Sequence, residues 1–122
     1  MFTESDWRKF RGMVPALRER YLASRNVRIS ALLADPKKTE TERFWAAMDV
    51  MKREARILCE CLDGHSRSKM WLFMLLMIRY GMLTREDLSG FSEGLQQELA
   101  IDLERKERGD AKRDQGHVSD VT

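Results

Sequence analysis

The chain has 122 residues, of which 34% are charged, and its 22 basic and 20 acidic residues leave a net charge of only +2. This length accommodates one domain, and the near balance of charge gives no reason by itself to expect nucleic acid or an anionic membrane as a partner. Helix-favouring residues dominate while valine is scarce, which predicts an all-α fold. The two cysteines cannot form a disulfide framework and the first residues do not resemble a signal peptide, so we expect a cytoplasmic protein.

The first helix is expected to begin at Thr3 or Ser5, which are both good N-cap residues, and to run to about Leu33. Apolar residues spaced by three and four place one stripe along this helix: Trp7, Phe10, Val14, Leu17 and Tyr21. Pro15 interrupts the segment, so the sequence predicts either a kinked helix or two separate helices.

A capping box, Thr39 with Glu42, predicts the start of the second helix, and Gly64 is placed to end it. Between them apolar residues repeat at steps of four and three, as in a heptad seam: Phe44, Met48, Met51, Ala55, Leu58 and Leu62. We expect this seam to be the packed side of the second helix.

The third helix is expected to follow Ser66 and to stop at Gly81, and it contains nine consecutive apolar residues from Met70 to Ile78. Nine helical residues span about 14 Å, less than half of a bilayer core, so the run cannot cross a membrane. Because the run is apolar all the way round, we expect the third helix to be central and covered on every side.

Thr84 is the predicted N-cap of the fourth helix, which should end near the basic residues 105–108. One apolar face follows from the spacing of Leu88, Phe91, Leu95, Leu99 and Leu103. No apolar periodicity continues after Gly109, which predicts a helical domain at residues 1–108 and a disordered tail at residues 109–122. Short links favour antiparallel neighbours, so the expected fold is a four-helix, possibly five-segment, mostly antiparallel bundle.

The third helix has more apolar surface than a small bundle can cover, and self-association as a homodimer would cover the excess. The expected interface residues are Trp71, Phe73, Met74 and Met77. The function that follows is that of a small cytoplasmic interaction or regulatory protein, which presents helical surfaces to itself and to another protein.

A second hypothesis is a nucleic-acid-binding regulator that uses arginines on one side of the first helix: Arg8, Arg11, Arg18 and Arg25. The alternative interpretation of these arginines is ion pairing with acidic residues of the second and fourth helices, such as Glu40, Glu42, Glu93, Glu98 and Asp102. We give this structural interpretation the greater weight.

A third hypothesis is a metal or redox site formed by Cys59, Cys61 and His65. On a helix the side chains of the two cysteines point about 200° apart, so they cannot coordinate one ion unless the helix unwinds. The alternative interpretation is that both cysteines pack as small apolar residues beside the seam. The sequence carries no phosphate-binding loop, nucleophile elbow or zinc-protease motif. Nothing in it therefore indicates an enzyme or a cofactor.

Overall fold

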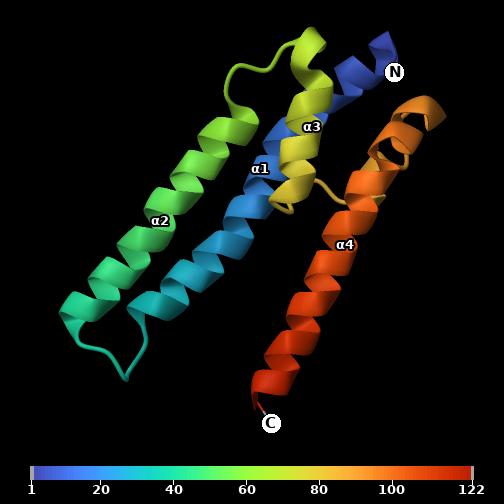
Figure 1. Cartoon of the computed structure of the whole chain (residues 1–122). Coiled ribbons are helices and arrows are strands. Elements are labelled where there is room, and N and C mark those ends of the chain that lie inside the picture. The colour runs from blue at the N-terminus through green and yellow to red at the C-terminus, as the bar shows by residue number, and fades with distance from the viewer. Residues whose placement is uncertain (1, 122) are drawn as a thin grey trace.

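The computed structural model describes the backbone of residues 2–121 and the side chains of residues 2–113. Within that range the chain has no strand and forms four α-helices (Figure 1): α1 (Glu4–Leu33), α2 (Glu40–Leu62), α3 (Met70–Arg79) and α4 (Glu93–Val121). Short 3₁₀ turns precede α3 at Arg67–Lys69 and lie between α3 and α4 at Glu86–Leu88. The expected all-α, four-helix fold is confirmed.

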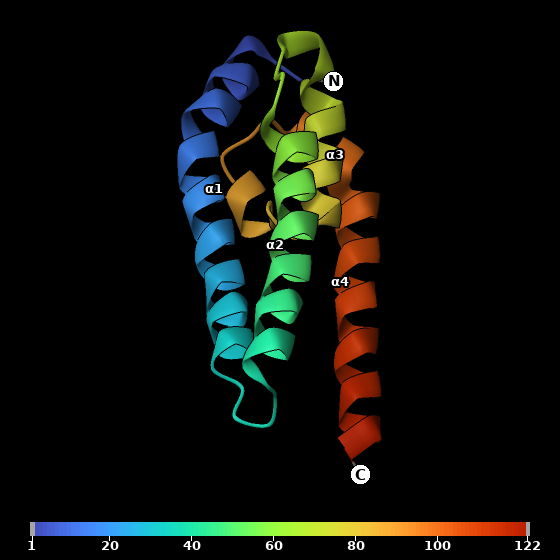
Figure 2. The same cartoon turned by 90° about the vertical axis from the view of Figure 1, so that its left-hand side faces the viewer.

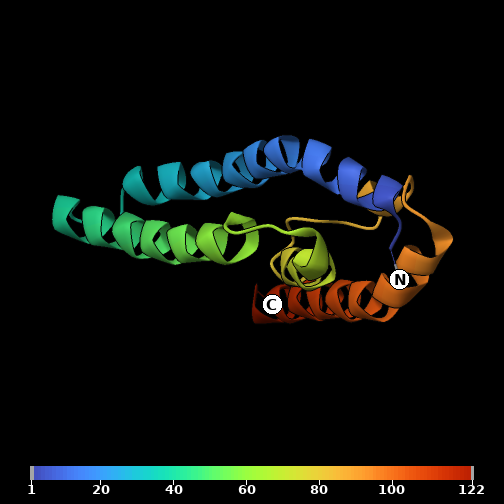
Figure 3. The same cartoon turned by 90° about the horizontal axis from the view of Figure 1, so that it is seen from above.

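The first helix is continuous. Thr3 is its N-cap and forms a capping box with Asp6, in which each side chain bonds the other residue's backbone N–H. Pro15 lies inside α1, so the prediction of two separate helices is wrong. The helix is bowed in the view of Figure 3, which agrees with the alternative of a bent helix.

The second helix begins and ends where its sequence signals indicate. Thr39 and Glu42 form the expected capping box, and Gly64 follows the helix with a φ of +74°, a left-handed conformation that glycine adopts without strain. Residues 34–39 join α1 to α2, and the two helices form a long antiparallel hairpin (Figures 1 and 2).

The third helix lies between this hairpin and α4 (Figures 1 and 3), and Gly81, at a φ of +77°, ends it as expected. Ile78 is buried, but Leu75 and Leu76 are only half-buried, while Trp71 and Leu72 are 43% and 51% exposed. The prediction that α3 is covered on every side is therefore wrong. A ten-residue helix flanked by two neighbours keeps one side open to solvent.

Residues 80–92, the return segment, run back along α1 before α4 begins. Thr84 was expected to cap α4, but its backbone N–H and hydroxyl both bond to Asp87 Oδ2 within a short turn. The helix itself starts only at Glu93. As a result α4 runs parallel to α3 (Figure 1), whereas α1 with α2 and α2 with α3 are antiparallel.

Three side chains of α1 hold the return segment against the helix through hydrogen bonds. Arg20 donates two hydrogen bonds to Asp87, of 2.9 and 2.7 Å, and a third to the carbonyl oxygen of Met82. Lys9 Nζ donates to the carbonyl oxygen of Gly90 at 2.8 Å. At the end of the segment Asp6, which is 3% exposed, accepts hydrogen bonds from the backbone N–H and the hydroxyl of Ser92.

The core lies where α1, α3, the return segment and the first half of α4 meet. Its buried apolar residues include most of the predicted stripes, among them Phe10, Leu17, Tyr21, Leu88, Phe91, Leu95, Leu99 and Leu103. Trp7 and Val14 of the predicted α1 stripe are half-buried at its edge. The predicted inner faces of the first and fourth segments are therefore correct.

α4 continues through Gly109 and is helical to Val121. For residues 109–113 the structure has helix in place of the expected disorder, and Asp110 there pairs with Lys106 at 3.1 Å and with Arg113 at 3.8 Å. The rest of the predicted tail, residues 114–122, lies outside the described side chains, and its separation from the domain stays a prediction. None of the helices within residues 2–121 combines the length and apolarity needed to cross a membrane.

Replacing Asp6 with alanine should lower the free energy of unfolding by about 2–4 kcal/mol, because it removes the carboxylate that accepts from the Thr3 backbone N–H in the capping box and leaves the Ser92 donors without their acceptor. Urea unfolding followed by far-UV circular dichroism measures this loss. Glu42→Ala is the matched control, since Glu42 has the same capping-box position but is exposed, and its hydrogen bonds are with Thr39 of its own cap. Equal losses in the two variants would show that the Ser92 contacts contribute nothing.

Stability should fall when the pH is lowered below about 4. Burial alone raises the pKa of Asp6 and of Asp87, but hydrogen bonds from Ser92 and Thr3 to Asp6, and from Arg20 and Thr84 to Asp87, outweigh it, so both pKa values lie below the ordinary value. Both carboxylates therefore stabilise the fold above the unfolded-state pKa, and this contribution is lost as the pH falls through the folded-state pKa. Urea midpoints at pH 7 and pH 3 should differ less for Asp87→Asn than for the wild type. Asp49→Asn, at an exposed position, should keep the wild-type difference.

Candidate interaction surfaces

An apolar stripe on α2 faces solvent. Phe44 is 49% exposed and Met51 is 50% exposed; Ala55 is exposed and Met48 is half-buried. The ring of Phe44 meets that of Trp45, itself 54% exposed, edge to face at a centroid distance of 5.1 Å. Phe44, Met48, Met51 and Ala55 belong to the predicted heptad seam, whereas Trp45 lies beside it.

The side of α2 that packs inside the chain is a different one. Its buried residues are Ala47, Val50, Glu54 and Cys61. Val50 and Met51 are consecutive, so the buried side and the stripe are about 100° apart on the helix. Only at the far end of the seam, at Leu58 and Leu62, do its residues pack against the core. The prediction that the whole seam is buried is therefore wrong for the half nearest the hairpin turn.

The hairpin turn adds a shallow hollow to this apolar surface. Leu33, which is 50% exposed, lines it together with Phe44 and Trp45, and its volume is about 510 Å³. Figures 1 and 3 show that this end of the hairpin extends beyond α3 and away from α4. Within the described residues, no third helix covers it.

The interface predicted on α3 is only partly available. Phe73, Met74 and Met77 are 8%, 0% and 0% exposed, because they fill the core between the hairpin and α4. They therefore cannot serve as surface residues, and this part of the prediction is corrected. Trp71 remains exposed, beside Leu72.

The predicted arginine row does not form one binding surface. Arg8, Arg11 and Arg18 are exposed; the guanidinium of Arg11 lies 5.7 Å from the Trp7 ring centre and Arg18 Nε lies 4.0 Å from Glu19. Arg25 points inward instead, and its Nε lies 3.4 Å from Glu54 Oε1. Pairing with an acidic residue of the second helix is thus correct for Arg25, although Glu54 was not among the expected partners.

Glu54 is the centre of a buried polar cluster on the inner side of the hairpin. It is 6% exposed and accepts a hydrogen bond from the hydroxyl of Tyr21, while the Arg25 guanidinium lies 4.4 Å from the centre of the Tyr21 ring. Burial raises the pKa of Tyr21, as does the bond to Glu54, so the tyrosine keeps its proton and donates. Apolar periodicity could not identify this buried glutamate, because the two partners that satisfy it lie on another helix.

The structure does not bring Cys59, Cys61 and His65 together as ligands. Cys59 is exposed and Cys61 is fully buried. His65 Nε2 lies 2.6 Å from the Cys61 carbonyl oxygen, and its ring packs between Phe10 and Phe73 at centroid distances of 5.1 and 4.5 Å. Among the side chains of residues 2–113, no three His, Cys, Asp or Glu residues are placed to share a metal ion.

Neither thiol has the lowered pKa that makes a cysteine reactive. A hydrogen bond to the Asp63 carboxylate raises the pKa of Cys59, and burial raises the pKa of Cys61 to about 11. A redox role for this pair therefore gains no support from its surroundings.

No family model matches the sequence, no curated protein is significantly similar to it, and no solved structure is a significant match to its fold. Its function is therefore inferred from its own surfaces.

A thiol reagent at pH 8 should modify one cysteine of the folded protein and both cysteines in urea. The folded protein should react at the exposed Cys59 alone, because Cys61 is inaccessible and almost wholly protonated at that pH. Mass spectrometry of the labelled protein counts the adducts, and Cys59→Ser should leave the folded protein unlabelled. Rapid modification of both cysteines without urea would contradict the burial of Cys61.

Proposed function

We propose that this protein is a helical interaction protein that self-associates through the exposed stripe of α2. The observation that carries the proposal is the heptad stripe Phe44, Met48, Met51 and Ala55, in which Phe44 and Met51 are about half exposed, Ala55 is exposed and Met48 is half-buried. A stripe with this spacing is the surface through which helices pair in coiled coils. The partner that we propose is a second copy of the chain.

A two-helix hairpin is half of a four-helix bundle. Near its turn the hairpin has only its own two helices, so two copies joined by their stripes would complete a bundle of the common type. Phe44 and Trp45 are aromatic residues of the kind that bury about 150–250 Å² each, and half of that area is still available on each of them. Burial of these rings is the main favourable term expected for the association.

The spacing of the stripe suits an antiparallel pairing about a two-fold axis. If Met48 of one copy lies opposite Met51 of the other, Phe44 lies opposite Ala55, so that a large side chain meets a small one in each outer layer. Methionines at the centre can adapt their shape to each other. This register makes the stripe complementary to itself, which supports a second copy as the partner.

Met51→Glu should raise the dissociation constant of the dimer at least 100-fold, because it places a charge in the centre of the proposed seam. Light scattering after size exclusion, over a range of protein concentrations, reports the mass. Val27→Glu is the control, since Val27 is 72% exposed on α1 and lies outside the stripe, and it should leave the mass unchanged. Circular dichroism checks that both variants are folded.

The register has a test of its own. Met48→Lys should also give a monomer, and a mixture of Met48→Lys with Met51→Glu should recover the dimer, because the lysine of one copy then faces the glutamate of the other. A wild-type protein with the mass of one chain at 100 μM would refute the proposal. A Met51→Glu variant of unchanged dimeric mass would refute it equally.

A further inference from the structure

A groove on the other side of the hairpin collects cationic side chains from all four helices. It lies where α1 and α2 face the end of α3 and the second half of α4, and its volume is about 460 Å³. Six of the residues that line it are basic: Arg25, Arg28, Arg53, Arg79, Lys106 and Arg113. Tyr21, Tyr80 and Ile57 supply aromatic and apolar parts of its lining.

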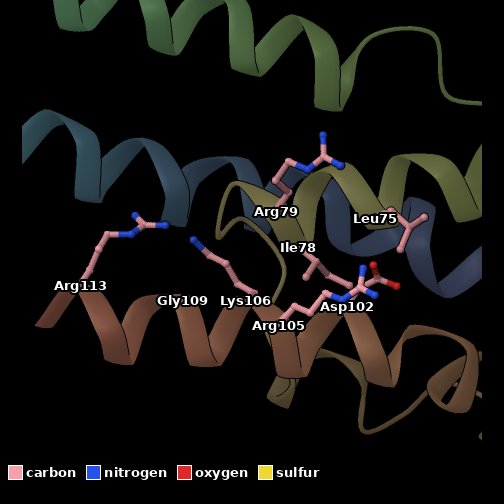
Figure 4. Close-up of a pocket in the computed structure, with 8 residues that line it drawn as sticks. All are labelled: Leu75, Ile78, Arg79, Asp102, Arg105, Lys106, Gly109 and Arg113. Atoms are coloured by element: carbon pink, nitrogen blue, oxygen red, sulfur yellow. The ribbon is translucent and has the colours of Figure 1, made fainter. Parts of the chain in front are cut away.

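A second hollow of about 310 Å³ adjoins this groove between α3 and α4 (Figure 4), and shares Arg79, Lys106 and Arg113 with it. In Figure 4 the side chains of Lys106 and Arg113 extend from α4 on the side that faces α3 and the hairpin. Lys106 and Arg113 of α4 therefore border both hollows.

The basic residues of α1 and α4 lie on the same helix faces as the buried residues that precede them. On α4 the buried leucines end at Leu103, and steps of three or seven residues lead to Lys106 and Arg113 on the same face. On α1 the buried Tyr21 is followed on the same face by Arg25 and Arg28, at steps of four and seven residues. The inner side of the molecule thus changes from apolar to cationic where the hairpin and α4 diverge.

Positive charge in the groove is only partly neutralised. Glu54 pairs with Arg25, Asp110 pairs with Lys106 and Arg113, and Glu60 accepts a hydrogen bond of 3.0 Å from Tyr80. No ion pair among the described side chains involves the other three basic residues, Arg28, Arg53 and Arg79. Among the described residues that line the groove, six are basic and one, Glu54, is acidic.

We propose that this groove binds a compact polyanion with two or more phosphate groups. Guanidinium groups form paired hydrogen bonds to phosphate oxygens, and arginines approaching from different helices can contact separate phosphates of one ligand. The volume of the groove falls in the range of small-molecule sites, about 300–1,000 Å³. The cations come from four helices around one hollow and do not form a row along a single helix, which favours a small ligand over the backbone of a nucleic-acid duplex.

Calorimetric titration with inorganic triphosphate as the probe tests the site. We expect saturable binding by the wild type, and at least a tenfold loss of affinity for Arg53→Glu. Arg56→Glu is the matched control, because Arg56 is an exposed arginine of the same helix that does not line the groove, and it should bind within twofold of the wild type. Arg53→Gln and Arg28→Gln, each with a smaller change of charge, should also weaken binding if Arg53→Glu fails to fold.

Further titrations distinguish the sources of the phosphate groups. ATP without magnesium and inositol hexakisphosphate should compete with triphosphate, and the tighter of the two shows whether a nucleoside or a cyclic polyol accompanies the phosphates. No binding of triphosphate at millimolar concentration, or equal losses in Arg53→Glu and Arg56→Glu, would overturn the proposal. Binding of a duplex oligonucleotide that triphosphate does not displace would overturn it in favour of a nucleic-acid surface.

Discussion

The antiparallel contact between the return segment and α1 is the constraint on which the rest of the structure depends. Arg20 binds both Asp87 and the Met82 carbonyl, and Asp6 binds Ser92, so residues 80–92 follow α1 back toward its N-terminus. The bonds from Ser92 and to the Met82 carbonyl are part-buried, and the Asp87 side chain is 12% exposed, whereas the Arg20 side chain is 51% exposed. Because each bond includes a charged group, it is stronger than a hydrogen bond between two neutral groups. Because the segment reverses the direction of the chain, α4 begins beside the start of α1 and runs parallel to α3.

The lengths of the helices then decide what is left uncovered. At about 1.5 Å per residue the 30 residues of α1 span about 45 Å, whereas the 10 residues of α3 span about 15 Å. α3 can therefore cover only one part of the hairpin, and α4 diverges from the other part (Figure 1). The half near the hairpin turn keeps an apolar stripe on its outer side and arginines on its inner side. Both proposed surfaces are consequences of this mismatch in length.

The sequence predicts helix ends better than helix partners. The N-cap at Thr3, one of two expected positions, and the capping box at Thr39 act within one turn, and so the local sequence predicts them. The heptad on α2 correctly indicates an apolar face, but periodicity does not say which neighbour, if any, meets that face. Thr84 carries the signal of a helix cap and instead closes a short turn with Asp87, whose carboxylate also accepts a hydrogen bond from Arg20 of α1. This contact between distant parts of the chain has no local signal in the sequence. The basic groove has no linear motif, because its residues come from four helices and meet only in the folded chain.

The two proposed surfaces share α2 and are therefore expected to be linked. Arg53 and Met51 are two residues apart and point about 200° from each other, so one helix carries a groove cation on one side and the proposed seam on the other. Pairing of two hairpins would restrict the motion of the helix half that carries Arg25, Arg28 and Arg53. A polyanion that bridges these arginines to Lys106 and Arg113 of α4 would restrict the same half. Dimerisation and polyanion binding then each lower the conformational-entropy cost of the other, so each increases the affinity of the other. By linkage the two effects are equal in free energy.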